Sequence, residues 1–256
     1  MKRKPKEPFT GEFIWCNLVL FFLVVFTCYA VPHIALSSAA PRQLPDRPVV
    51  ILDPGHGGVD GGASTADGVA EKGINLNISL LLRDFLRSAG VEVVMTRETD
   101  LSIHDDSATT IRKKKASDLN NRLAIARKNP TAIFISIHQN KFEQSQYHGA
   151  QIFYSKNHER SRSLAQAIDA SIKRRLQPGN KRELKQGGKN LFLLWNSPLP
   201  TVLVECGFLS NPVEAQKLQT EAYQREMAFS IFCGIEAYLN EIDSAGQRGE
   251  PSALPE

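Results

Sequence analysis

Cysteine is scarce in this sequence, and the few cysteines stand far apart. The four are Cys16, Cys28, Cys206 and Cys233, and no Cys-x-x-Cys pair occurs among them. This spacing supports neither a disulfide framework nor a zinc site built from thiolates. Cys206 lies in an apolar run, where a catalytic nucleophile is one interpretation. A small buried residue at the end of a strand is the interpretation that we favour.

The sequence also lacks a strong excess of charge beyond its N-terminal region. The formal net charge is +4, but residues 1–42 hold five basic and two acidic residues, which leaves 26 basic against 25 acidic for the rest. Because this larger part is nearly neutral, its composition gives no support to a nucleic-acid-binding function. One basic run, Arg112–Lys115, remains, and such runs are typical of a solvated loop.

An uncharged apolar run of 19 residues, 13–31, comes after a basic segment at 1–12. Basic residues before an apolar run favour retention of the N-terminus in the cytoplasm and export of the residues after the run. The run is longer than the roughly 7–15 apolar residues of a cleaved signal and close to the roughly 20 that span a bilayer. It offers no polar face, which argues against a helix buried in a soluble domain. We therefore predict a cytoplasmic segment at 1–12, a signal or anchor helix at 13–31 and a linker at 32–47.

Cleavage of this segment stays open, because the small residues Ala30 and Ala39 are suited to a signal-peptidase site. Pro41 would hinder a cut directly after Ala40. We favour an uncleaved membrane anchor. With or without cleavage, the rest of the chain is expected to lie outside the cytoplasmic membrane.

Apolar residues alternate between strand-like runs and helical spacing over the remainder of the chain. The expected strands are 48–53, 91–95, 132–137, 150–154, 191–194 and 202–205, and the expected helices are 74–89, 118–128, 160–176 and 224–239. We expect irregular polar structure at 98–115 and a loop at 178–189. This alternation predicts a single three-layer α/β domain at 48–241, with a mostly parallel sheet flanked by helices. A flexible tail is expected at 242–256.

Four residues with chemically active side chains occupy the ends of predicted elements. His56 and His138 follow or end strands, Glu71 lies at the start of the first helix, and Glu205 ends a late strand. In α/β folds, functional side chains gather at the carboxyl ends of strands. Each residue alone has a plainer interpretation, such as a turn histidine or a glutamate that serves the helix dipole. Glu205 is less easily explained, because an ionised carboxylate is costly to bury unless it is paired or metal-bound.

Taken together, two imidazoles and a carboxylate match the ligand set of a catalytic zinc ion with an open fourth position. A second carboxylate nearby would take a proton from water and deliver it to a leaving nitrogen. The glycines around His56, in GHGGVDGG, fit neither the GxGxxG pattern nor a P-loop, so we set a nucleotide site aside.

The sequence resembles the zinc-dependent N-acetylmuramoyl-L-alanine amidases of the amidase 3 family from about Val49 to Leu239. The motifs that carry the resemblance occur in order: DPGHGG, EK followed by Asn75-Leu76, Thr96-Arg97, Asn121-Arg122, SIH with Asn140, and VECGFLSN. The resemblance implies zinc ligands at His56, Glu71 and His138, and a catalytic role for Glu205. It also implies the substrate, which is the amide between N-acetylmuramic acid and L-alanine in peptidoglycan.

Within this family, the likeness is greatest to the sporulation-associated type, which joins an N-terminal apolar segment to a bare catalytic domain. That type implies a role in spore cortex maturation, where muramic-δ-lactam is made together with a peptidoglycan deacetylase, and a location between the membranes of the forespore. Gln139 and Lys141 depart from the small or apolar residues of many relatives, and we expect them at the rim of the cleft.

Three alternatives remain beside this interpretation. One is an amidase of vegetative wall turnover, and another is a wall-binding protein without activity, which the presence of all four residues argues against. The third is a zinc carboxypeptidase on stem peptides, which needs a basic residue for the terminal carboxylate. Arg97 or Arg122 would be the candidate for that role, although a structural salt bridge is an equally good interpretation of either.

Overall fold

The structure is a computed structural model that describes residue 15, residues 18–26 and residues 48–247. The chain forms two compact units, Met1–Leu44 and Pro45–Glu256. The first unit contains a helix at 18–26 whose side chains are exposed. The expected basic segment, the linker and the ends of the expected anchor helix lie outside the described residues. Of the helices in the described ranges, none is both long and apolar enough to cross a bilayer.

The second unit is built on a six-stranded sheet with the order β2-β1-β3-β6-β4-β5. The strands are β1 (Val50–Pro54), β2 (Val93–Met95), β3 (Ile133–Asn140), β4 (Gln151–Tyr154), β5 (Lys185–Gln186) and β6 (Thr201–Phe208). Every pairing is parallel except that of β4 with β6. The central strands are buried on both faces, as their near-continuous apolar sequences require. The predicted mostly parallel sheet is therefore confirmed.

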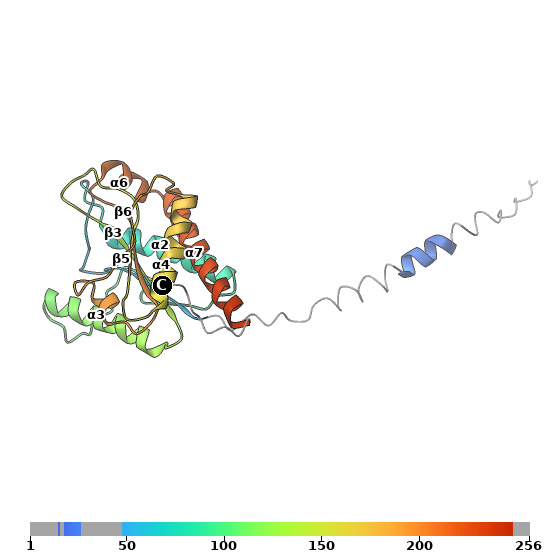
Figure 1. The fold of residues 1–256 in the computed structure, drawn as a ribbon, viewed down its shortest axis with the longest axis horizontal. Helices are drawn as coiled ribbons and strands as arrows, with labels where there is room; N and C mark the ends of the chain where they lie inside the picture. The colour runs from blue at the N-terminus through green and yellow to red at the C-terminus, as the bar shows by residue number, and fades with distance from the viewer. Residues whose placement is uncertain (1–14, 16–17, 27–47, 248–256) are drawn as a thin grey trace, which may run out of the picture. The chain divides into compact units, whose positions relative to one another are not determined.

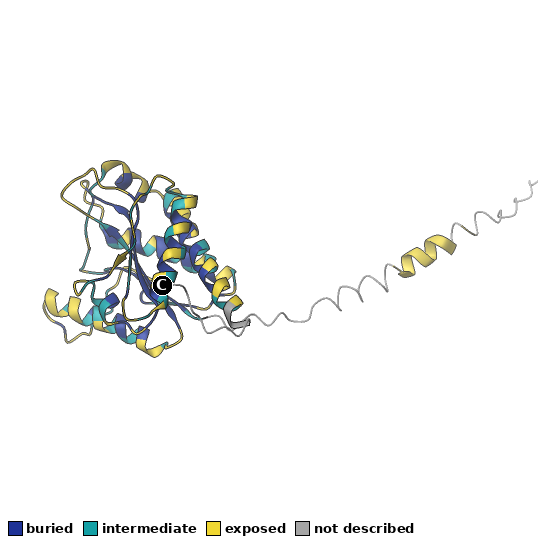
Figure 2. Ribbon diagram, in the orientation of Figure 1, coloured by how far each residue is buried: buried dark blue, intermediate teal, exposed yellow. Residues whose placement is uncertain are grey.

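Helices cover both faces of the sheet (Figure 1). The helices are α2 (Glu71–Ser88), α3 (Ile111–Lys128), α4 (Arg160–Arg175), α5 (Phe192–Asn196), α6 (Pro212–Leu218) and α7 (Glu221–Gln247). Helices α2, α4 and α7 share the larger core cluster with alternate strand residues such as Leu52 and Val204. Helices α3 and α5 share the smaller cluster, which contains Ile51 and Phe134. The sheet and the inner helix faces are the buried part of the unit (Figure 2), which confirms three layers.

The predicted strand at 191–194 is wrong, because these residues belong mainly to the short helix α5. The run FLLW is too short for its periodicity to distinguish a buried strand from a helical turn. The helical turn buries Leu193 against the α3 side of the sheet.

The basic run Arg112–Lys115 is also not a loop, since it forms the first turns of α3. The Thr110 side chain caps this helix by accepting a hydrogen bond from the Lys113 amide. The helix was expected at 118–128, and apolar spacing did not indicate its first part, 111–117, because these residues are mostly polar.

Two further features differ from the expected ones. Helix α7 continues to Gln247, past the expected domain end at 241, whereas α2 begins at Glu71, the residue expected at its start. Helix α6, capped by Asn211 and begun by Pro212, was not predicted. The Asn-Pro pair is a helix-start signal that apolar periodicity overlooks.

Candidate metal centre

The four predicted residues meet at the carboxyl edge of the central strands. His56 follows β1, His138 lies near the end of β3, and Glu71 is the first residue of α2. Ligand-type atoms of these three side chains all lie within 4.8 Å of one another. Glu205, in β6, is the register partner of His138. Their convergence follows from the parallel order of β1, β3 and β6, which brings the ends of these strands to one edge.

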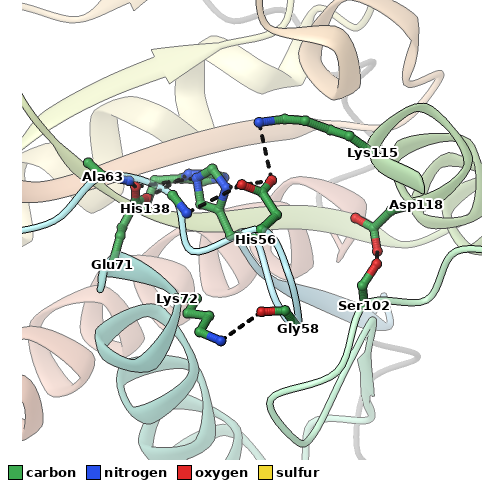
Figure 3. Close-up of polar contacts among 12 residues, drawn as sticks. His56, Gly58, Ala63, Glu71, Lys72, Ser102, Lys115, Asp118 and His138 are labelled. Carbon is green, nitrogen blue, oxygen red and sulfur yellow. Dashed lines mark hydrogen bonds and ion pairs between the residues drawn. The ribbon is translucent and has the colours of Figure 1, made fainter. Parts of the chain in front are cut away.

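The Glu71 carboxylate contacts both imidazole rings, one oxygen to each (Figure 3). Its Oε2 is 3.3 Å from His56 Nε2, and its Oε1 is 3.0 Å from His138 Nδ1. The ring centroids of the two histidines are 5.0 Å apart. Zinc holds nitrogen and oxygen donors at about 2.0–2.2 Å in a tetrahedron, so its ligands stand close to one another in this way. Two imidazoles and one carboxylate at this spacing fit a zinc ion.

Backbone and amide donors hold the buried Glu71 carboxylate in place. Its Oε1 accepts hydrogen bonds from the Gln139 amide and from Asn75 Nδ2, each at 3.0 Å. Its Oε2 accepts from the Ala63 amide at 2.8 Å. Burial alone would raise the pKa of Glu71, but the hydrogen bonds and charges of His138 and His56 hold it well below its ordinary value. The carboxylate is therefore ionised and ready to bind a cation.

Asp60 orients His56 from the side opposite Glu71. Asp60 Oδ2 is 3.0 Å from His56 Nδ1 and 3.2 Å from Lys115 Nζ, which reaches over from α3 (Figure 3). Burial would lower the pKa of His56, but Asp60 and Glu71 raise it to about 9. A carboxylate on the far ring nitrogen fixes the tautomer of a metal-binding histidine. Sequence reasoning missed Asp60, although an aspartate four residues after His56 was an available signal.

Two buried arginines support the loop that carries His56. Arg97 donates to the Pro54 and Gly55 carbonyls, each at 2.9 Å. Arg122 donates to the Pro54 and His56 carbonyls at 2.8 and 2.7 Å and pairs with Asp53 at 2.6 Å. These contacts hold His56 at a φ of 63°, in a region that non-glycine residues seldom adopt. Of the two interpretations of these arginines, the structural one holds.

The glycines of this loop allow the backbone to approach the ligands closely. A Cβ added to Gly55 would lie 2.2 Å from the His138 ring, and one added to Gly62 would lie 2.5 Å from Glu71 Oε2. Gly62 also has a φ of 70°. The glycine-rich sequence is therefore explained by packing around the metal centre, without a phosphate site.

Glu205 differs from the other three residues in its hydrogen bonding. Its Oε2 is buried and has no hydrogen-bond partner within the part of the chain that the structure describes. Burial raises the pKa of Glu205 to about 7; His138 and His56 oppose this rise, and the charge of Glu71 adds to it. A carboxyl group with a pKa near neutrality, beside a metal centre, is suited to proton transfer.

Of the other residues singled out in the sequence, Gln139 lies elsewhere than expected. Gln139 is buried, and its side chain donates to Asn75 Oδ1 at 3.1 Å, so it supports the centre from within and does not line the rim. Lys141 is exposed, and its Nζ donates to the Ser64 carbonyl at 3.0 Å. Cys206 is fully buried, and burial raises the pKa of its thiol, so it is not a nucleophile.

Comparisons with known proteins agree with this geometry. The profile of the Amidase_3 family, described as N-acetylmuramoyl-L-alanine amidase, matches residues 50–237. The germination-specific N-acetylmuramoyl-L-alanine amidase of Bacillus subtilis is 32% identical over 228 residues, which cover 89% of this chain and 95% of that protein. The amidase AmiA of Escherichia coli is 27% identical, over 77% of this chain and 78% of that protein.

Solved structures give the same likeness. The CwlD amidase of Clostridioides difficile, solved in complex with the GerS lipoprotein, superposes with a TM-score of 0.73 and 42% identity over 76% of this chain and 99% of that one. The amidase AmiC2 of Nostoc punctiforme superposes with a TM-score of 0.64 and 27% identity over 75% of this chain and 97% of that one.

Proposed function

The chain belongs to the N-acetylmuramoyl-L-alanine amidase family and is a peptidoglycan amidase, and we propose that His56, Glu71 and His138 bind its zinc ion while Glu205 transfers protons. The observation that carries these roles is the close His-Glu-His cluster beside Glu205, whose buried Oε2 lacks a hydrogen-bond partner among the described residues. Hydrogen bonds hold Glu71 and orient His56, whereas Oε2 of Glu205 has no such partner among the described residues and is available for proton transfer.

The mechanism assigns one role to each residue. A zinc ion held by His56, Glu71 and His138 would polarise the scissile carbonyl and lower the pKa of a water molecule. Glu205 accepts a proton from the attacking water as the new C–O bond forms, and it donates that proton to the amide nitrogen as the C–N bond breaks. Its pKa of about 7 suits both steps near neutral pH. Asp60 keeps the ring of His56 in its binding orientation throughout.

The bond cleaved is the amide between the lactyl group of N-acetylmuramic acid and L-alanine. We place this reaction in spore cortex maturation, where a deacetylase acts on the product and muramic-δ-lactam results. The germination-specific relative from B. subtilis supports this assignment over vegetative wall turnover. The carboxypeptidase alternative loses its candidates, because Arg97 and Arg122 are committed to buried carbonyls.

Peptidoglycan lies outside the cytoplasmic membrane, and the enzyme therefore acts outside the cytoplasm. We propose that the apolar run at 13–31 holds it at the membrane surface, in the space between the forespore membranes. The basic residues before this run support that orientation.

Mass spectrometry of digested peptidoglycan tests the reaction. With zinc present, the protein should release stem peptides that begin with a free L-alanine amine, whereas a carboxypeptidase would release the terminal amino acid. The variant Glu205→Gln should bind zinc, keep its fold and lose at least about 100-fold in rate, because general acid–base catalysis contributes that much. Substantial residual activity in this variant would contradict the role of Glu205.

The sporulation assignment has its own test. Spores of a strain without the gene should contain no muramic-δ-lactam in their cortex. A normal lactam content would contradict the sporulation assignment and favour a role in vegetative wall turnover. It would leave the assignment of amidase activity unchanged.

A further inference from the structure

The edge of the sheet that carries the metal centre continues past Glu205 to two more strands. Gln151, the first residue of β4, pairs with Glu205 across the antiparallel ladder. Arg182 comes three residues before β5, which runs parallel to β4. The starts of β4 and β5 therefore lie at the same edge as the end of β6. Because neighbouring strands are about 4.8 Å apart, Arg182 stands roughly 10 Å from Glu205 along this edge.

The Arg182 side chain is held in a fixed orientation. Its Nε donates to the His148 carbonyl at 2.8 Å, and its Nη1 donates to Gln151 Oε1 at 3.2 Å. The guanidinium group lies 4.4 Å from the centre of the Phe208 ring and 5.7 Å from that of Tyr147. Stacking of this kind restricts a long side chain before any ligand arrives.

The positive charge of Arg182 is not neutralised by a direct ion pair. Within residues 48–247, no carboxylate lies within 4.0 Å of its nitrogens, and Nη2 donates to none of the described atoms. Glu214 is near enough to feel this charge, but its carboxylate already accepts hydrogen bonds from the amides of Gly149 and Phe208. Arg182 is half-buried and thus remains open to a further acceptor.

We propose that Arg182 binds the free carboxylate of the second stem residue, the one directly beyond the L-alanine whose nitrogen leaves. The proposal rests on the amidase function above and names a determinant of its specificity. An extended peptide advances at most about 3.6 Å per residue. The second stem residue therefore comes within reach of an arginine that stands about 10 Å from Glu205 along the edge of the sheet. Its Nη2, which donates to none of the described atoms, can donate a charge-assisted hydrogen bond to an oxygen of this carboxylate.

A matched pair of muropeptides tests this role. The two differ only in the second stem residue, which is D-glutamate with a free α-carboxylate in one and D-isoglutamine in the other. The wild-type enzyme with zinc should cleave the acid with a kcat/KM about tenfold above that of the amide, since a charge-assisted hydrogen bond exceeds a neutral one by about that factor. Arg182→Gln should bring this ratio close to one, and Arg182→Lys should keep part of it.

Arg175→Gln is the matched control. Arg175 is an exposed arginine at the end of α4 that also lies over a phenylalanine ring, Phe229, at 5.6 Å. Its removal should leave the acid-to-amide ratio unchanged. If Arg182→Gln does not fold, a smaller ratio in Arg182→Lys than in the wild type supports the proposal.

Each remaining outcome overturns the inference. Equal cleavage of the two substrates by the wild type, or an undiminished ratio in the Arg182 variants, refutes carboxylate binding while the amidase function stands. Equal losses on both substrates, with a lower melting temperature, assign Arg182 a purely structural role. Failure of the wild type to cleave either substrate removes the proposed function and the inference with it.

Discussion

At the scale of single residues, burial decides which charged side chain supports the fold and which meets the substrate. Arg122 and Arg182 are the same residue type near the same edge of the sheet. Arg122 is 1% exposed and donates hydrogen bonds to Asp53, Asp118 and backbone carbonyls. Arg182 is half-buried and faces no ion-pairing carboxylate among the described residues. The sequence alone does not tell which of the two arginines has which role. The residues next to each arginine in the chain do not reveal its burial or its distant partners.

Asp53 gives a prediction at this scale. Its fully buried carboxylate pairs with Arg122 and accepts hydrogen bonds from Thr96 and Ser136. Asp53→Asn leaves the Arg122 charge without this partner, so we expect the free energy of unfolding at pH 7 to fall by about 3 kcal/mol. Asp84→Asn, which removes a largely exposed partner of Arg83, should change it by less than about 0.5 kcal/mol.

The stability difference caused by Asp53→Asn should depend on pH. Burial alone would raise the pKa of Asp53, but Arg122 and the two hydroxyl groups hold it below its ordinary value. The stabilisation by this carboxylate is therefore present above the pKa of an ordinary aspartate, near 4, and is lost as the pH falls through the lower folded pKa. Denaturant titrations at several pH values should show the gap between wild type and variant narrowing below about pH 4. A gap that stays constant would contradict this account.

At the scale of elements, the predictable features are those that a local pattern specifies. The apolar runs of β1, β3 and β6 indicated the core strands, and the order of strands and helices indicated the parallel sheet. The convergence of His56 and His138 was then expected, since the ends of parallel strands share one edge. The four-residue run of α5 held no such information. Its helical form depends on tertiary packing with α3, which a single short segment does not encode.

The sequence predicted where the loop between β1 and α2 lies, but not why its glycines are needed. Its glycines suggested a turn, whereas the reason for Gly55 is the imidazole of His138, 83 positions further along the chain. Asp60 was overlooked for a related reason, because its role depends on the rotamer of His56 and on Lys115 from α3. Contacts between residues this far apart in the sequence form only when the sheet is assembled.

Gly55 gives a prediction for this loop. A Cβ at this position would meet three atoms of the His138 ring at 2.2–2.7 Å. Gly55→Ala should therefore displace the ring and raise the zinc dissociation constant at least about tenfold, as changes in groups that orient metal ligands do. Competition with a chromophoric chelator measures this constant. Unchanged zinc affinity would mean that the loop relaxes without moving the histidine.

Gly73→Ala is the control for Gly55→Ala. Gly73 lies within α2, and nothing stands within 4 Å of a Cβ added there. Zinc affinity should be unchanged, and the free energy of unfolding should rise by about 0.5–1 kcal/mol, because alanine favours a helix over glycine by that amount.

At the scale of the whole molecule, recognition and catalysis share one edge of one sheet. Strands β1, β3 and β6 carry the proposed metal and proton-transfer residues, and β4 and β5 extend the same edge to Arg182. The antiparallel β4 makes this extension possible, since its start, rather than its end, meets the end of β6. A peptide that runs along the edge passes from the reacting amide to the arginine without crossing a domain boundary.

The division of the chain into two units gives the last prediction. Both core clusters and all four site residues belong to the unit Pro45–Glu256. A protein that begins at residue 45 should therefore unfold at the same temperature as the full chain and cleave soluble muropeptides at the same rate. Expressed in cells with an export signal, it should leave the membrane fraction, whereas the full chain should remain there. A fragment that melts at a lower temperature or binds zinc more weakly would show that the N-terminal unit contributes to the catalytic fold. Membrane association of the fragment would place the anchor within residues 45–256.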